Sequence, residues 1–277
     1  MGSLGVGVIS FNRPGYLRRV LASLEAQTQV DDAEYWLFQD GAVNRFSGVP
    51  HGKQEDVEAC RALFDRARLP NKHVTHWPDN VGVAINSLEA LDTLSDNYAR
   101  VILLEGDAVL SPHWLRLAGL LFDDLAARPN VFSVSPNFRS EGPDADAVRI
   151  GWRHMWAECF LAERWHAIRP YYIEDYWPHV CDRDYFRRDT GAINATYATR
   201  GVTGGPGGLA WSQDGGRQLA MMRAGMQRSF LEVNRAISIG REGIHFTPAL
   251  FHEQGFDFPG PFIHEADATR GGFTWPA

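Results

Sequence analysis

The chain has 277 residues, of which 44% are hydrophobic and 22% charged, and this suits one large α/β domain or one such domain with a C-terminal elaboration. A formal net charge of −7 argues against a general nucleic-acid binder, which normally carries a basic excess. The three cysteines are widely spaced without a CxxC pair, which argues against a disulfide framework or a structural zinc site.

No apolar stretch approaches the roughly 18 residues of a membrane span, and 4–10 is too short, and lacks the basic leader, for a secretory signal. We therefore expect a cytoplasmic protein, one able to dock peripherally on a membrane.

The first 135 residues alternate between strand and helix patterns. Apolar runs predict strands over 4–10, 34–39, 74–77, 101–104 and 131–135. Helical spacing predicts helices over 16–26, 55–68 and 83–94, and Ser111 followed by Pro112 predicts the N-cap of a helix that runs to about Ala127. This alternation indicates a Rossmann-like, mostly parallel sheet flanked by helices.

Beyond residue 136 the composition changes. Aromatic residues crowd 151–186, a glycine-rich stretch covers 201–208, and 215–223 has helical spacing. The last 35 residues, rich in Gly, Pro, His and Phe, read as loop. We expect most of the aromatic residues, including Trp152 and Trp156, to be core, with stacking on sugar rings as the alternative.

The segment Val101–Asp107 is the most informative in the chain. Four branched aliphatic residues predict a buried strand, which ends at Glu105, Gly106 and Asp107. Ligands of open α/β sheets collect at the carboxyl ends of strands. Two acids there need a cation, and a divalent metal with a diphosphate would supply it.

Two further strand ends fall on the same predicted edge. Arg13 follows the first strand and can bind a diphosphate, and Asp40 ends the second strand and can accept the imide N–H of a uracil. The alternatives are a surface charge for Arg13 and a plain Asp-Gly turn for Asp40.

The order of these pieces resembles the GT-A glycosyltransferases, and more narrowly the N-acetylglucosaminyltransferase I type with its bacterial and phage relatives. The resemblance extends from about Gly5 to His252. The matching segments are Val8–Pro14, Gln39–Gly41, Asn80–Ala84, Leu104–Pro112, Trp211–Asp214 and Val233–Gly240.

The resemblance implies roles for particular residues. Leu104–Pro112 resembles the family's Glu-Asp-Asp segment, in which the last acid binds the metal, so Asp107 becomes the expected ligand of Mn²⁺ or Mg²⁺. Gly106 replaces the middle acid, and Glu105 would act through a bridging water. The helix after Asn80 lacks the family's nucleotide-binding histidine, and Asn86 lies near that place.

The resemblance also implies inversion by one direct displacement, which requires a base for the acceptor hydroxyl. Trp211–Asp214 resembles the segment that holds it, so Asp214 is the candidate. Four acids are rivals on chemistry alone, namely Glu174, Asp175, Asp182 and Asp184. Arg241 and His245, in a glycine-flanked segment, could reach phosphates from a lid, whereas a zinc site is not expected because no HExxH is present.

We therefore expect residues 1–135 to bind the nucleotide-sugar donor, and 136–277 to form the acceptor-binding half and the C-terminal lid of one continuous GT-A domain. The expected reaction moves a sugar, most simply N-acetylglucosamine, from a UDP-sugar to a hydroxyl of a glycan, lipid, protein or modified nucleobase. The alternatives are a sugar-nucleotide nucleotidyltransferase and a noncatalytic module that binds nucleotide or carbohydrate.

Overall fold

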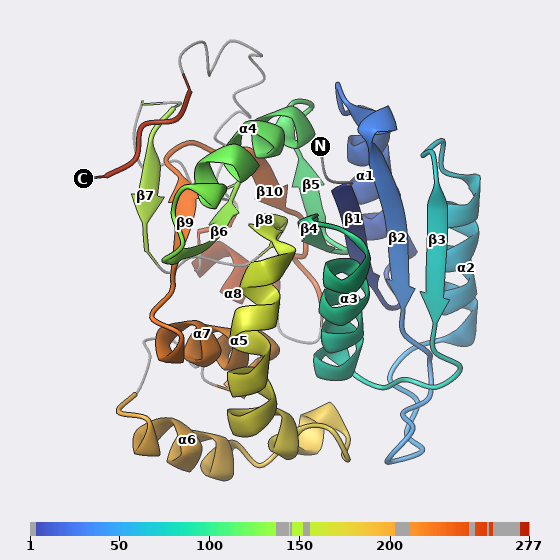
Figure 1. The fold of residues 1–277 in the computed structure, drawn as a ribbon. Helices are drawn as coiled ribbons and strands as arrows, with labels where there is room; N and C mark the ends of the chain where they lie inside the picture. The colour runs from blue at the N-terminus through green and yellow to red at the C-terminus, as the bar shows by residue number, and fades with distance from the viewer. Residues whose placement is uncertain are drawn as a thin grey trace.

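An eight-stranded sheet forms the centre of the protein, in the strand order β3-β2-β1-β4-β8-β6-β9-β7 (Figure 1). The computed structural model describes residues 4–136, 144, 146–151, 156–202, 211–243, 247–253, 255–256 and 272–276.

The first four strands of the sheet are parallel. β1 (Leu4–Ser10) lies between β2 (Ala33–Gln39) and β4 (Arg100–Glu105), and β3 (Lys72–His76) pairs with β2 at the edge. The apolar runs of β1, β2 and β4 are largely buried because helices cover both faces of the sheet, whereas the edge strand β3 has no buried residue. The predicted strands are confirmed to within about two residues at each end.

The other half of the sheet mixes directions. β8 (Glu158–Leu161) lies antiparallel between β4 and β6 (Val131–Ser135), β9 (Gln227–Leu231) runs parallel to β6, and β7 (Val148–Ile150) pairs antiparallel with β9. Residues from both sides of position 135 therefore share one sheet. The chain does have the mostly parallel α/β architecture that was expected.

Two core clusters hold the helices against the sheet. One contains side chains of α1 (Pro14–Glu25), α2 (Gln54–Arg66) and α4 (Trp114–Ala126). The other contains side chains of α3 (Val83–Asn97), α5 (Ala162–Asp175), α6 (Thr190–Thr199) and α7 (Gln213–Arg223). The remaining helical elements are η1 (Val30–Asp32), η2 (Trp177–His179), η3 (Tyr185–Arg187) and α8 (Pro248–Glu253).

Two local predictions are wrong. The N-cap of α4 is His113 and not Ser111. A short strand, β5 (Ala108–Leu110), precedes it and pairs antiparallel with β10 (Ala236–Ser238), and the Ser111 N–H donates to the Arg235 carbonyl at 2.8 Å. The expectation of loop throughout the last 35 residues fails at α8, whose Phe251 is buried against Phe256.

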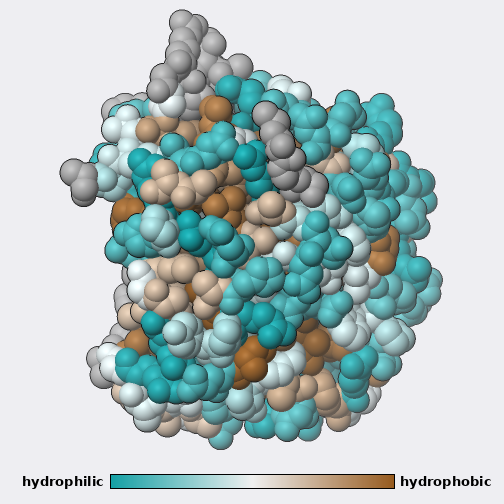
Figure 2. All heavy atoms as spheres, viewed as in Figure 1, coloured by the Kyte–Doolittle hydropathy of each residue, from teal (hydrophilic) through white to brown (hydrophobic). Residues whose placement is uncertain are grey.

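The aromatic region is mostly core, as predicted. Trp165, Tyr172 and Tyr176 are fully or almost fully buried in the cluster that contains α5. Trp156 packs against Phe256, and Trp152 lies outside the described residues. The face shown in Figure 2 accordingly carries hydrophobic residues only in small areas among hydrophilic ones. No helix within the described ranges is long and apolar enough to cross a membrane.

Candidate active site

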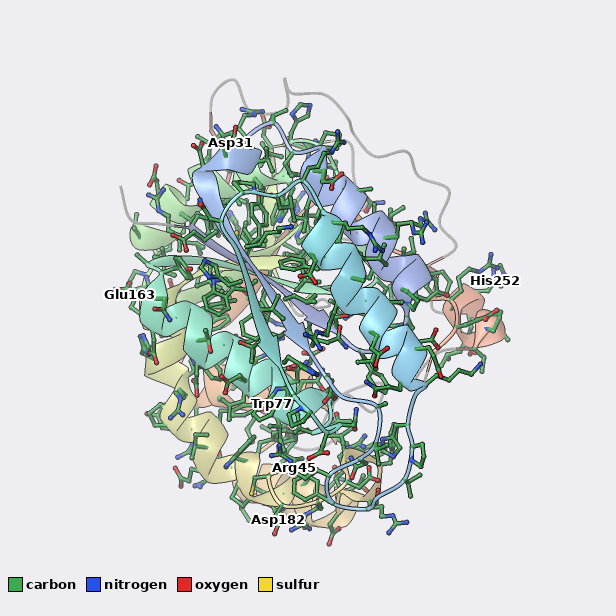
Figure 3. The ribbon with its side chains drawn as sticks, turned by 90° about the vertical axis from the view of Figure 1, so that its right-hand side faces the viewer. Asp31, Arg45, Trp77, Glu163, Asp182 and His252 are labelled. Carbon is green, nitrogen blue, oxygen red and sulfur yellow. The ribbon has the colours of Figure 1, made fainter. Side chains whose placement is uncertain are left out.

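The carboxyl ends of β1, β2 and β4 meet at one edge of the sheet. The register pairs Ser10 with Gln39 and Ile9 with Glu105, so the segments that follow these strands start side by side. Figure 3 shows Arg45 and Trp77 at this end of the molecule and Asp31, which precedes β2, at the opposite end. The predicted ligand-binding edge therefore exists as a single rim.

Arg13 and Asp107 are in direct contact on this rim. The Arg13 Nη2 lies 2.8 Å from the Asp107 Oδ2, and the Arg13 guanidinium also lies 5.2 Å from the ring centre of Tyr16. The Asp107 side chain is 15% exposed and that of Arg13 37%, so both remain within reach of solvent. The predicted diphosphate-binding cation and the predicted metal ligand thus neutralise each other in the unliganded protein.

Glu105 and Gly106 connect β4 to Asp107. The pKa of Glu105 is raised to about 8, chiefly by burial and then by the charges of Asp214 and Asp107, while Arg217 and Arg13 oppose the rise. A Cβ at position 106 would lie 2.9 Å from the carbonyl oxygen of Ile9. Glycine therefore stands where the family pattern has an acid because β1 passes too close for a side chain.

The segment after β10 packs against Asp107. The Ile239 N–H donates to the Asp107 carbonyl at 2.9 Å, and the Glu242 N–H donates to the Tyr16 hydroxyl at 3.2 Å. Gly240 lies so near Asp107 that a Cβ there would be 2.2 Å from Oδ2. Arg241 is exposed beside this contact, and His245 lies outside the described residues, so the lid stays a prediction for both.

Asp214 approaches Glu105 and Asp107 from α7, a helix of the second core cluster. It lies in the first turn of α7, whose N-cap Ser212 accepts the Gly215 N–H at 3.1 Å. Its side chain is 18% exposed, and its charge acts on Glu105. The fold thus brings Glu105, Asp107 and Asp214 together from positions about a hundred residues apart in the sequence.

The four rival acids have their own partners. Glu174 and Asp175 both pair with Arg200 and Arg223, and Asp182 pairs with Arg183 at 2.7 Å. Asp184 accepts the Ser47 hydroxyl at 2.7 Å and lies 3.2 Å from the His51 Nε2. Asp214 differs from these four acids in its interaction with Glu105 and not in lacking a partner, and its role as the base stays a prediction.

Asp40 and Asn86 are placed differently from the residues on the rim. Asp40 is 4% exposed and accepts four hydrogen bonds of 2.8–3.1 Å, from the N–H groups of Gly41, Val81 and Gly82 and from the Asn80 Nδ2. Asn86 is buried, donates to the Phe38 carbonyl at 3.0 Å and accepts from the Trp77 Nε1 at 3.2 Å. Both side chains shape the turn before α3, and their contact with a nucleotide stays a prediction.

Two charged residues behind Asp214 were not found from the sequence. The buried Arg217 donates to the Asp214 Oδ1 at 2.9 Å and to the Glu158 Oε1 at 2.5 Å. A signal existed in each case. Asp214 and Arg217 are three apart on a helix, and Glu158 is a lone acid in the apolar strand Glu158–Leu161, where it must find a partner.

The carboxylates fit a hard divalent ion that is shared with a substrate. Mg²⁺ and Mn²⁺ take oxygen ligands, and Mg²⁺ typically binds through one or two carboxylates completed by substrate phosphates and water. Asp107, with Glu105 two residues away, offers this donor set. Within the described residues, no three His, Cys, Asp or Glu side chains are grouped so that they could hold a metal without such a substrate.

Comparison with known proteins gives the fold. No protein-family model and no curated protein matches the chain. Among solved structures, TarS 1–349 of S. aureus in complex with UDP-GlcNAc superimposes with a TM-score of 0.50 at 15% identity, over 91% of this chain and 64% of that one. The fold is that of the GT-A glycosyltransferases.

Two other matches are weaker. The mannosyltransferase PcManGT from Pyrobaculum calidifontis, in complex with GDP-Man and Mn²⁺, gives a TM-score of 0.42 at 17% identity, over 61% of this chain and 46% of that one. The galactosyltransferase LgtC, with donor and acceptor sugar analogs, gives 0.41 at 11%, over 82% and 72%. The chain spans less than two-thirds of the TarS and PcManGT chains.

Proposed function

We propose that this GT-A chain is a metal-dependent, inverting glycosyltransferase of the N-acetylglucosaminyltransferase I type. It moves a sugar, most simply N-acetylglucosamine, from a UDP-sugar to an acceptor hydroxyl. The observation that carries the proposal is the convergence of Glu105, Asp107 and Asp214 with Arg13 at the carboxyl edge of the sheet. TarS, which has the same fold, has been crystallised with UDP-GlcNAc.

The donor half of the reaction needs positive charge at the diphosphate. Arg13 reaches the rim from the start of α1 and is free to exchange Asp107 for phosphate oxygens when a nucleotide arrives. A divalent cation held by Asp107 and the donor phosphates would add the charge that the leaving nucleoside diphosphate requires. Arg241, exposed next to Gly240, is placed to approach the same phosphates.

The acceptor half needs a base on the other side of the sugar. Asp214 takes the proton of the acceptor hydroxyl while the oxygen attacks the anomeric carbon and the bond to the diphosphate breaks. One displacement of this kind inverts the anomeric configuration, and it forms no covalent bond with the enzyme.

The test is a transfer assay with the whole chain, UDP-GlcNAc, Mn²⁺ and a panel of hydroxyl acceptors, namely oligosaccharide, glycolipid, protein and hydroxylated nucleobase. We expect UDP release that depends on acceptor and metal, and a product of inverted configuration by NMR. GDP-mannose in place of UDP-GlcNAc tests the choice of donor.

The Asp214→Asn variant should lose roughly 100-fold or more in kcat, because a positioned base contributes about that factor. Asp182→Asn, which alters a rival acid that is paired with Arg183, is the matched control and should keep full activity. Release of pyrophosphate would indicate a nucleotidyltransferase instead, and donor binding without turnover on any acceptor would indicate a noncatalytic module.

A further inference from the structure

A continuous chain of polar contacts leads from the interior of the sheet to Asp214. The Ser229 hydroxyl donates to the Ser133 carbonyl at 2.8 Å, and the Ser133 hydroxyl donates to the Glu158 Oε2 at 2.7 Å. The other oxygen of Glu158 accepts Arg217, which in turn donates to Asp214. The chain crosses β9, β6, β8 and α7, and its last member is the candidate base.

The middle of this chain is buried almost completely. The side chains of Arg217 and Glu158 are 4% and 1% exposed. Glu158 is paired with Leu103 of β4, two residues before Glu105, so it lies directly behind the carboxylates of the rim. Each oxygen of the Glu158 carboxylate accepts a hydrogen bond, one from Ser133 and one from Arg217, and these two contacts orient the side chain.

Burying such a pair is costly for stability. Each ion loses several kcal/mol of solvation, and buried pairs are often no more stabilising than apolar residues of the same volume. The Arg217 Nε also has no hydrogen-bond partner within the described part of the chain. An ion pair that leaves a donor without a partner contributes little to stability. The contact that the Arg217 guanidinium makes on its other side, away from Glu158, is therefore the more informative one.

On that side the Arg217 guanidinium contacts one oxygen of Asp214. Arg217 and Asp214 are one helical turn apart, and the guanidinium Nη2 contacts Oδ1. Among the described residues no hydrogen bond to Oδ2 is made. Arg217 thereby fixes the carboxylate group and leaves its second oxygen available to a substrate proton.

We propose that Arg217 and Glu158 are positioning residues for the glycosyl transfer, with Arg217 orienting Asp214 through Oδ1 and Glu158 locking Arg217 from the core. This inference rests on the proposed function, in which Asp214 is the base. In the step that it serves, the acceptor proton moves to Oδ2 as the new C–O bond forms, and the bond to the diphosphate breaks with its electrons leaving on the phosphate oxygen.

Several other charges and ionisable groups act on the same carboxylate. Glu105 approaches from the end of β4, Tyr172 from α5, Tyr185 from η3, and the buried Arg228 from β9. Arg217 is the cation in direct contact with Asp214, so its position affects the orientation of the base.

The test compares kcat, the donor KM and the pH profile of kcat for the wild type and four variants. Arg217→Met should lower kcat about 10-fold or more with a donor KM within about twofold, and should move the acid limb of the profile up by roughly one pH unit, because a cation beside a carboxylate is lost. Arg217→Lys keeps the charge and should restore the acid limb but recover kcat only in part, because an ammonium lacks the planar fork.

Glu158→Gln preserves volume and can still accept from Arg217. It should lower kcat less than Arg217→Met, and because Arg217 keeps its charge without its second counter-ion, the acid limb should stay in place or move down. An upward movement of the limb in Arg217→Met without one in Glu158→Gln is not expected from loss of stability alone.

Arg223→Met is the matched control. Arg223 lies on the same helix and pairs with Glu174 and Asp175 instead. It should lower the melting temperature without moving the pH profile.

The failures are distinguishable. If the wild type transfers no sugar, the proposed function is wrong. If the wild type is active and Asp214→Asn is not, but Arg217→Met and Glu158→Gln keep the pH profile and kcat of Arg223→Met, the positioning role is wrong and the function stands. Should Arg217→Met fail to fold, Arg217→Lys and Glu158→Gln decide the question by the same comparison.

Discussion

Arg13 occupies the carboxylate that a metal ion would use, since its Nη2 lies 2.8 Å from the Asp107 Oδ2. The two residues come from different strand ends, β1 and β4, and meet because those strands are parallel neighbours. An ion pair here lowers the repulsion among Glu105, Asp107 and Asp214 in the unliganded protein. Under the proposed function, donor and metal together must separate the pair, which favours their joint binding over that of either alone.

Arg13→Met should therefore change the affinities for Mn²⁺ and for UDP in opposite directions. Without its counter-ion, Asp107 becomes a better ligand, so Mn²⁺ alone should bind about 10-fold more tightly. This factor corresponds to about 1.4 kcal/mol, slightly less than the roughly 1.5–3 kcal/mol of a hydrogen bond to a charged group, because the Arg13 side chain is partly exposed to solvent. UDP should bind about 10-fold more weakly because a phosphate contact is lost. Electron paramagnetic resonance titration of free Mn²⁺ and calorimetry with UDP measure the two quantities.

Arg18→Met is the control for this prediction, because Arg18 is exposed on the same helix. It should change neither affinity. Equal Mn²⁺ affinity in Arg13→Met and wild type would mean that Arg13 does not compete with the metal for Asp107.

The elements that were predicted well are those encoded locally. β1, β2 and β4 contain apolar runs flanked by turn residues, and α1 to α3 carry a regular apolar stripe, so periodicity located them within a few residues. β7 and β8 were missed because each is only three or four residues long. Their place is decided by pairing with strands far away in the sequence, which no local pattern contains.

Some residues of the candidate site could likewise be predicted from the sequence, and others could not. The rule that ligands collect at carboxyl ends of parallel strands placed Arg13 and Asp107 at one edge without a structure. The rule also selected Asp40, yet there the amides of the Asn80–Gly82 turn fold back onto the carboxylate and occupy its oxygens. Glu158 was missed because its partner, Arg217, is brought to it by the packing of α7 against β8. The only sign of this contact in the sequence is an acid in an apolar strand.

Gly240→Ala should impair the site with little cost in stability. The added methyl would lie 2.2 Å from the Asp107 Oδ2 and 2.9 Å from its Cγ, so the carboxylate has to move away from Arg13. The carboxylate is the end of a side chain and can move aside, whereas backbone could not. We therefore expect the melting temperature to stay within about 3 °C of wild type, which corresponds to a change of under about 1 kcal/mol in the free energy of unfolding. The Mn²⁺-dependent increase in melting temperature with UDP should largely disappear.

Gly119→Ala is the control, since position 119 lies within α4 and a Cβ there meets nothing within 4 Å. It should be neutral or stabilising by up to about 1 kcal/mol and should keep the response to UDP and Mn²⁺. A normal response in Gly240→Ala would indicate that Asp107 does not need its present position for metal binding.

Asp40 should make the protein less stable as the pH rises from about 4 to about 6. Burial raises the pKa of Asp40 to about 6 from an ordinary value of 3.8, although the N–H groups of Val81, Gly41 and Gly82 lower it. The folded state therefore binds the proton more tightly than the unfolded chain. The resulting stability is fully present below pH 3.8 and is lost as the pH passes through about 6, an effect of up to about 3 kcal/mol.

Urea unfolding at several pH values between 4 and 7 measures this effect against Asp40→Asn, in which the position cannot ionise. The variant should be less stable at pH 4 by about 1–3 kcal/mol, because an amide NH₂ replaces one acceptor of the N–H groups around it. The free energy of unfolding should then fall less steeply with pH than in the wild type. Asp79→Asn, which alters an exposed acid whose Oδ2 lies 3.8 Å from the Arg45 Nε, should retain the wild-type slope. Parallel slopes in wild type and Asp40→Asn would show that Asp40 is already ionised throughout this range, held in that state by its four hydrogen-bond donors.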